Sequence, residues 1–212
     1  MRKEGFNEIS EPMKIYTMVS PSHEPLLDGW LKTSNRDPLF KPVVDRCPIA
    51  SDGDYMNAQW NEISIYGTNL FLKTIKDNIG SIIGVCGVDV RFIRPFIHDV
   101  YDLFSDHDVL FQRERADDSF MNPDVSFWRC TEKLYLAWVE YIELFKSFDG
   151  TLSHQNELMK KAFRELKLGL LPHRYASTDN GGINNDPVLF HANCLPPPDS
   201  VRKKLESLAR FS

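Results

Sequence analysis

The chain has 212 residues, of which 42% are hydrophobic and 26% are charged, and its formal net charge at pH 7 is −5. A chain of this length buries roughly 70% of its unfolded surface, so it can form one domain with a substantial core and has no compositional sign of disorder away from its ends. The acidic balance and the lack of a basic stripe argue against a nucleic-acid ligand, because phosphate-backbone binding relies on clustered Lys and Arg.

The first half of the sequence alternates predicted strands and helices. Runs of β-branched and aromatic residues indicate strands, and apolar residues at helical spacing, such as Trp60, Ile63 and Leu70, indicate helices. We predict strands at 13–20, 40–44 and 81–86 and helices at 22–32 and 55–76.

The second half continues the alternation. We predict a helix at 96–104, a strand at 108–112, a charged loop at 113–119 and a strand at 125–129. Thr131 is expected to cap a helix that ends at Asp149-Gly150, and Ser153 a second helix that runs through Leu168 and stops at Gly169. An irregular loop at 172–186, a strand at 187–190 and a helix from Asp199 complete the pattern.

This order of elements predicts one α/β domain over 1–212, with a leader at 1–12, a terminal helix at 199–212 and a mostly parallel sheet. Its four cysteines, Cys47, Cys86, Cys130 and Cys194, are far apart and form no CxxC pair, so we expect reduced thiols. No apolar run reaches the roughly 20 residues needed to span a bilayer. We expect a cytoplasmic protein without a membrane span.

Two strand-like segments end in residues that bind divalent metals. Asp89 follows the 81–86 strand, and His191 follows the apolar run at 187–190. Two strands that deliver a carboxylate and an imidazole to one edge of a sheet can hold a cation for a phosphorylated ligand. An imidazole ligand favours Mn²⁺, with Mg²⁺ as the alternative.

The segment Gly87-Val-Asp-Val-Arg-Phe92 resembles the Asp-x-Asp segment of nucleotide-diphospho-sugar transferases with the GT-A fold. Four further segments resemble that family in the same order, so the resemblance covers about residues 13 to 195. It also extends to the amino-terminal domain of a large virus-encoded member. The four segments are Asp108-Val-Leu-Phe-Gln112, Asn122-Pro-Asp-Val-Ser-Phe-Trp-Arg-Cys-Thr131, His154-Gln-Asn156 and Pro187-Val-Leu-Phe-His-Ala-Asn193.

The resemblance implies a GT-A-like, Rossmann-like domain whose mixed, mostly parallel sheet is flanked by helices. The implied activity is metal-dependent transfer of a hexose or deoxyhexose, of glucose or rhamnose type, from a UDP-sugar to a glycan or glycoprotein, with retention of configuration. Asp89 and His191 are implied as metal ligands, and Asp124 and Gln155 as catalytic residues. The implied nucleotide-binding residues are Thr17, Met18, Val19, Asn69, Lys73, Val88 and Asp89. The implied sugar- and acceptor-binding residues are Asn122, Asp124, His154 and Gln155.

Three positions depart from the family pattern: Gly87 replaces the first Asp of Asp-x-Asp, Asp124 replaces a Gly, and His154 replaces an Asp. We expect a weakened metal site rather than an absent one. Two alternatives stay open, a nucleotide-sugar-binding domain without turnover and a nucleotidyltransferase. Lys73 also fits a solvated helix residue, and the basic segment Arg202-Lys-Lys204 fits either a solvated helix face or the junction to a further C-terminal domain.

Overall fold

A six-stranded central sheet organises the computed structural model, which describes residues 12–51, 59–113, 121–148, 151–179, 182, 185–193 and 195–212. Its strand order is β2-β1-β3-β6-β5-β7. Five strands run in one direction and β6 runs against its neighbours, so the predicted mixed, mostly parallel sheet is confirmed. The strands are β1 (Met13–Val19), β2 (Phe40–Arg46), β3 (Ile82–Cys86), β5 (Val109–Arg113), β6 (Met121–Arg129) and β7 (Leu168–Leu170).

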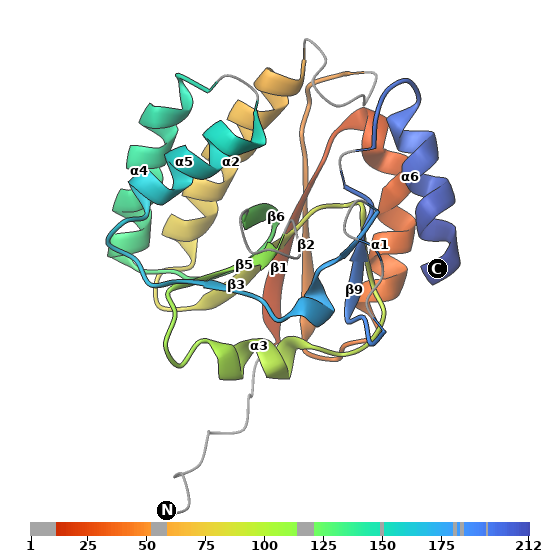
Figure 1. Ribbon diagram of the computed structural model, residues 1–212, viewed down its shortest axis with the longest axis horizontal. Helices are drawn as coiled ribbons and strands as arrows, with labels where there is room; N and C mark the ends of the chain where they lie inside the picture. The colour runs from red at the N-terminus through yellow and green to blue at the C-terminus, as the bar shows by residue number, and fades with distance from the viewer. Residues whose placement is uncertain are drawn as a thin grey trace, which may run out of the picture.

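Helices cover both faces of this sheet (Figure 1). One core lies under α2 (Trp60–Asp77), α4 (Glu132–Phe145) and α5 (Leu152–Ala162). The other core lies under α1 (Leu27–Ser34), α3 (Ile97–Leu103) and α6 (Ser200–Leu208). Because successive strand residues point to opposite faces, β3 supplies Ile83 and Val85 to the first core and Ile82 and Cys86 to the second. A strand buried on both faces reads as a continuous apolar run.

A second, three-stranded sheet has the order β4-β9-β8 and was not predicted as a sheet. It consists of β4 (Val90–Phe92), β9 (Leu189–His191) and β8 (Ser177–Thr178). β4 and β9 are antiparallel, with Val90 opposite His191. Strands of two or three residues are too short to show a period, so the sequence predicted only the β9 segment. The pairing of β4 with β9 brings the segment after β3 next to the segment that precedes α6 (Ser200–Leu208).

The predicted boundaries of one helix were wrong. Thr151, rather than Ser153, caps α5, since its side-chain oxygen accepts a hydrogen bond from the backbone N–H of His154 at 3.3 Å. The helix ends at Ala162, and the predicted stop Gly169 lies inside β7. A Cβ at Gly169 would lie 2.4 Å from the ring of His107. The glycine therefore permits close packing of the sheet edge rather than ending a helix.

Other differences are smaller. The first helix begins as a 3-10 segment, η1 (Pro21–Leu26), in which Pro25 lacks the N–H that an α-helix would pair with the carbonyl of Pro21. The predicted 172–186 loop contains η2 (His173–Tyr175) and β8, and β6 starts at Met121, earlier than expected. Thr131 caps α4 as predicted, accepting from the backbone N–H of Leu134 at 3.1 Å.

Several predicted features lie outside the described residues: the leader up to residue 11, the start of the 55–76 helix, most of the charged loop, the Asp149-Gly150 stop and Cys194. Cys47, Cys86 and Cys130 are buried free thiols, in agreement with expectation. None of the helices that the structure describes combines the length and apolar character needed to cross a membrane.

Candidate functional site

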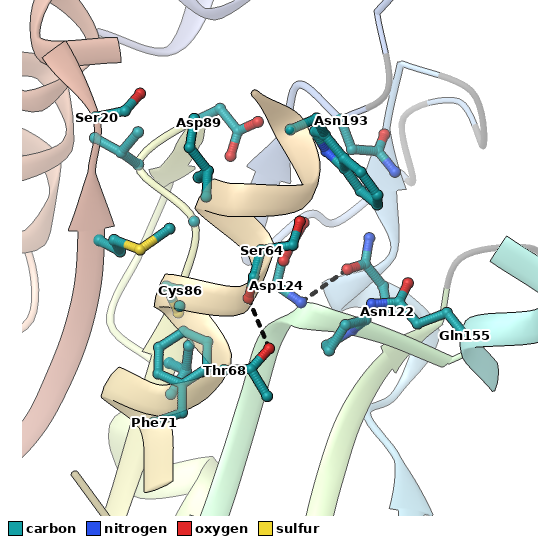
Figure 2. A pocket seen from close by; sticks show the side chains of 18 of the residues that line it. Ser20, Ser64, Thr68, Phe71, Cys86, Asp89, Asn122, Asp124, Gln155 and Asn193 are labelled. Atoms are coloured by element: carbon teal, nitrogen blue, oxygen red, sulfur yellow. Dashed lines mark hydrogen bonds between the residues drawn. The ribbon is translucent and has the colours of Figure 1, made fainter. Parts of the chain in front are cut away.

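A cavity of about 300 Å³ opens at the carboxyl ends of β1 and β3, where ligands bind in open α/β sheets. Asp89 lies on one side of it, and Asn122 and Gln155 lie on the other (Figure 2). Ser64 and Thr68 of α2 also line the cavity. Its wall is apolar where α2 and α4 approach, and the apolar side chains there are those of Ile63, Phe71, Trp138, Tyr141 and Phe145.

Asp89 and His191 meet at the polar side of this cavity. Asp89 lies in the turn between β3 and β4, and its carbonyl accepts from the backbone N–H of Ala192 at 3.0 Å. The β4–β9 register then places the Nε2 atom of His191 3.3 Å from the Oδ1 atom of Asp89. Both residues are buried. The structure therefore brings together the two residues that the sequence singled out as metal ligands.

Gln112 fixes the orientation of the His191 imidazole. The Gln112 amide nitrogen donates to the carbonyl oxygen of Tyr175 at 2.6 Å, so its amide oxygen faces His191 Nδ1 at 2.9 Å. That oxygen only accepts, so Nδ1 carries the proton. In the neutral ring the lone pair then lies on Nε2, the nitrogen that faces Asp89. An imidazole held in this way through its other nitrogen is the usual arrangement of a metal-ligating histidine.

A third group, Lys204 of α6, also contacts Asp89. Its Nζ atom lies 2.7 Å from Oδ2 of Asp89. Burial alone would raise the pKa of Asp89, but the Lys204 ammonium, together with His191, holds this pKa well below its usual range. A Cβ at Gly87 would lie 2.5 Å from Oδ1 of Asp89. The glycine that replaces the expected first Asp thus leaves room for the Asp89 carboxylate in this orientation.

Two further residues support this corner. Arg91 is buried and donates to the backbone carbonyls of Val88, at 3.3 Å, and of Leu26, at 3.1 Å, which ties the Asp89 turn to the segment before α1. His23 lines the cavity, and its Nδ1 atom lies 3.0 Å from the Ser20 hydroxyl oxygen. Burial, reinforced by the charge of Lys204, lowers the pKa of His23 to about 4, while Asp89 acts in the opposite direction. His23 is therefore neutral at pH 7.

The opposite side of the cavity carries the residues predicted for the sugar. Asn122 is buried, and its Oδ1 atom accepts from the backbone N–H of Asp124 at 2.9 Å. Asp124 is exposed at the open cavity. The protein atoms around it and Asp89 raise its pKa, His191 and Lys204 oppose the rise, and water screens the shift. Gln155 comes from α5 and lines the same wall.

Not every residue predicted for the site reaches the cavity. Asn69 and Lys73 are exposed on α2 outside the cavity wall, and Lys73 forms an ion pair with Asp77. His154 packs its ring near Phe148 instead, with centroids 6.1 Å apart.

The residues predicted from the first strand divide in the same way. Met18 lines the cavity, whereas Thr17 and Val19 are buried beside it and do not line it. Val88 is buried and lines the cavity.

Sequence reasoning missed Gln112, Lys204, His23 and Arg91 as site residues. Gln112 and Arg91 had a usable signal, since each is a polar residue inside an apolar strand-like run. Lys204 and His23 had none, because they lie on segments that read as surface helices. Within the described ranges, no group of three or more His, Cys, Asp and Glu side chains is placed to hold a metal ion. Asp89 and His191 are therefore a two-residue set.

Comparison with known proteins adds information on the fold. No family model matches the chain, and no curated protein matches its sequence. Solved structures do match. The glycosyltransferase GlyE of Streptococcus pneumoniae TIGR4 superposes with a TM-score of 0.62 at 9% identity, covering 92% of this chain and 60% of GlyE. This chain thus spans less than two thirds of the length of that protein.

Two matches are similar to this chain over almost their full length. A glycosyltransferase involved in glycosylation of the major capsid of the chlorella virus PBCV-1 gives a TM-score of 0.64 at 8% identity, covering 92% of this chain and 99% of that one. The galactosyltransferase LgtC, solved with donor and acceptor sugar analogs, gives 0.57 at 12% identity, covering 94% and 96%. The chain therefore has the GT-A-like fold of nucleotide-sugar transferases.

Proposed function

We propose that this chain is a metal-dependent glycosyltransferase that moves a hexose or deoxyhexose from a UDP-sugar to a carbohydrate acceptor. The observation that carries the proposal is the approach of Asp89 Oδ1 to His191 Nε2, at 3.3 Å, beside a cavity at the carboxyl ends of the strands. The GT-A-like fold supports it, because a cavity at this place in an α/β sheet suits a nucleotide.

The two side chains fit a shared divalent cation. Neighbouring ligands of a six-coordinate ion, each about 2.1 Å from the metal, are about 3 Å apart, and the observed separation of 3.3 Å is close to that spacing. The bond from Nδ1 to Gln112 leaves the Nε2 lone pair toward the same point. Asp89 and His191 would hold Mn²⁺ or Mg²⁺, which would stabilise the negative charge that develops on the diphosphate leaving group.

The other wall would hold the transferred sugar. Asn122, Asp124 and Gln155 offer amide and carboxylate groups to sugar hydroxyls, while the apolar side of the cavity keeps water from the donor. We propose retention of configuration, in which a donor phosphate oxygen guides the acceptor and no protein nucleophile is needed. If the reaction inverts instead, Asp124, a carboxylate on the cavity wall, would accept the acceptor proton.

Release of UDP tests this function. Purified protein is incubated with UDP-glucose and, separately, UDP-rhamnose, each with Mn²⁺ or with EDTA, and free UDP is measured. The proposal predicts UDP release from at least one donor that requires the metal and is faster with a glycan acceptor. Tight donor binding without release would instead support a nucleotide-sugar-binding domain. The motive for that alternative is Gly87, which stands where the family pattern has an Asp. Pyrophosphate release from UTP would support a nucleotidyltransferase.

A further inference from the structure

Lys204 occupies one side of the carboxylate that we propose as a metal ligand. Its ammonium lies 2.7 Å from Asp89 Oδ2, while His191 Nε2 lies 3.3 Å from Oδ1. The side chains of Lys204 and Asp89 are only 14% and 11% exposed. The two oxygens of Asp89 are thus divided between an imidazole and a lysine 115 residues further along the chain.

The lysine is delivered by a packed helix rather than by a loose tail. Leu208 at the end of α6 is buried in the core, and the Ser200 hydroxyl at its start donates to the carbonyl of Leu195 at 3.0 Å. In contrast, the neighbouring Lys203 donates to the carbonyl of Pro196 at 2.8 Å and does not line the cavity. The packing of α6 therefore fixes the Lys204 side chain at the cavity, where it is mostly buried.

The charge balance at this point depends on the lysine. Gly87 adds no carboxylate beside Asp89, Lys204 offsets the Asp89 charge, and Asp124 is the other carboxylate that interacts electrostatically with Asp89. A divalent cation added beside Lys204 would be repelled at short range, because like charges about 4 Å apart interact by several kcal/mol at intermediate dielectric. A nucleoside diphosphate supplies the negative charge that would remove this repulsion.

We propose that Lys204 is a built-in counter-ion that competes with the divalent cation for Asp89. The inference rests on the proposed function and adds a binding order to it. Without nucleotide, the lysine holds the carboxylate and the metal binds weakly. When a nucleoside diphosphate enters, its phosphate oxygens take up the ammonium, Asp89 turns to the cation, and metal and nucleotide bind cooperatively.

Mn²⁺ titration of the nucleotide-free protein tests the competition. Bound Mn²⁺ is measured from the loss of the electron paramagnetic resonance signal of the free aqueous ion. Lys204→Met is expected to bind Mn²⁺ at least about tenfold more tightly than the wild type. Lys204→Arg, which keeps the charge, and Lys203→Met, which removes a charge from the neighbouring position outside the cavity, are expected to bind like the wild type. Lys204→Gln is a second neutral variant in case Lys204→Met does not fold, as judged by circular dichroism.

Repeating the titration with UDP gives a second reading. In the wild type, UDP is expected to raise Mn²⁺ affinity more than it does in Lys204→Met, since the variant has no ammonium for the diphosphate to displace from Asp89. Equal nucleotide-free affinity of the wild type and both neutral variants, with UDP-linked Mn²⁺ binding intact, would overturn the competition alone. No Mn²⁺ binding by any variant, with or without UDP, would overturn both the competition and the proposed metal-dependent function.

Discussion

The two sides of the cavity are built in different ways. On the Asp89 side, buried hydrogen bonds fix the functional groups. Gln112 bonds to the imidazole of His191, and Arg91 donates to the carbonyl of Val88 in the turn before Asp89. On the Asn122 side, Asp124 and Gln155 line the cavity, and the hydrogen bond from the Asp124 backbone N–H to Asn122 Oδ1 is a local one that spans two residues. The Asp89 side, buttressed by bonds between residues far apart in sequence, suits an invariant group such as a diphosphate, and the locally bonded side can adapt to different sugars.

Asp89→Asn is expected to have the largest effect, because it removes the charged ligand from the buttressed side. Metal assistance supplies several kcal/mol, so the rate of Mn²⁺-dependent UDP release should fall at least about a hundredfold. Asp28→Asn, which changes an exposed carboxylate on α1, is the matched control and should retain the wild-type rate. A rate for Asp89→Asn within a factor of three of the wild type would show that the chemistry lies elsewhere.

Gln112→Leu breaks the support behind His191 without touching the cavity. Loss of a hydrogen bond to a ligating histidine weakens metal binding about 10- to 100-fold, and the Tyr175 carbonyl left unpaired lowers the free energy of unfolding by about 1–3 kcal/mol. Mn²⁺ titration in the presence of UDP and urea unfolding measure the two effects. Gln155→Leu on the opposite side is the control, and it should leave Mn²⁺ affinity unchanged. Equal Mn²⁺ affinities for both variants would contradict the contrast between the two sides.

Asp124→Asn tests the adaptable side. It keeps the size of the side chain and removes the charge, so UDP and Mn²⁺ affinities should stay within about twofold while turnover falls about tenfold, the loss expected for one hydrogen bond to a sugar. Calorimetry with UDP and the UDP-release assay separate the two quantities. If nucleotide affinity falls as much as turnover, Asp124 belongs to the diphosphate side instead.

Substitution of His23 is expected to have the smallest effect on activity at pH 7. The residue instead makes the free energy of unfolding depend on pH below neutrality. Its pKa is about 4 in the folded protein and about 6.5 when unfolded, so the unfolded state binds the proton more readily between these values. Stability is therefore full above pH 6.5 and declines as the pH falls toward 4, by about 2 kcal/mol at pH 5. Urea unfolding at pH 7 and pH 5 measures this decline.

His23→Gln should flatten the decline, since glutamine does not titrate. The groups whose charges act on His23 are Lys204 and Asp89, and the pKa of Asp89, held well below its usual range, keeps that carboxylate charged over this pH interval. An unchanged slope in His23→Gln would assign the acid sensitivity to other groups.

The central sheet could be predicted from the sequence because its strands are buried on both faces and its helices are long. The run at 81–86 and the helix after Thr131 carry their signals within a few residues. The second sheet could not be predicted in this way, since β4 and β8 are set by pairing with β9 rather than by any local pattern. The same limit applied to Gly169, whose place in the sequence after Leu168 suggested a helix stop, whereas in the structure it permits close packing against His107.

The residues of the candidate site that belong to a sequence motif could be predicted. Asp89 and His191 were found from the strand ends and from the family resemblance, and the structure places them together. Lys204 could not be found, because its role depends on where α6 packs, and no nearby residue encodes that contact. Asn69 and Lys73 were predicted because they lie on the helix before Asp89, but both are exposed on α2 and do not line the cavity.

The most direct measurement is isothermal titration calorimetry of UDP into the wild type and His191→Ala, each with and without Mn²⁺. We predict that Mn²⁺ strengthens UDP binding to the wild type by at least about tenfold and that His191→Ala loses this strengthening. UDP binding that is equally tight with and without Mn²⁺, and that survives His191→Ala unchanged, would contradict a cation shared by Asp89 and His191.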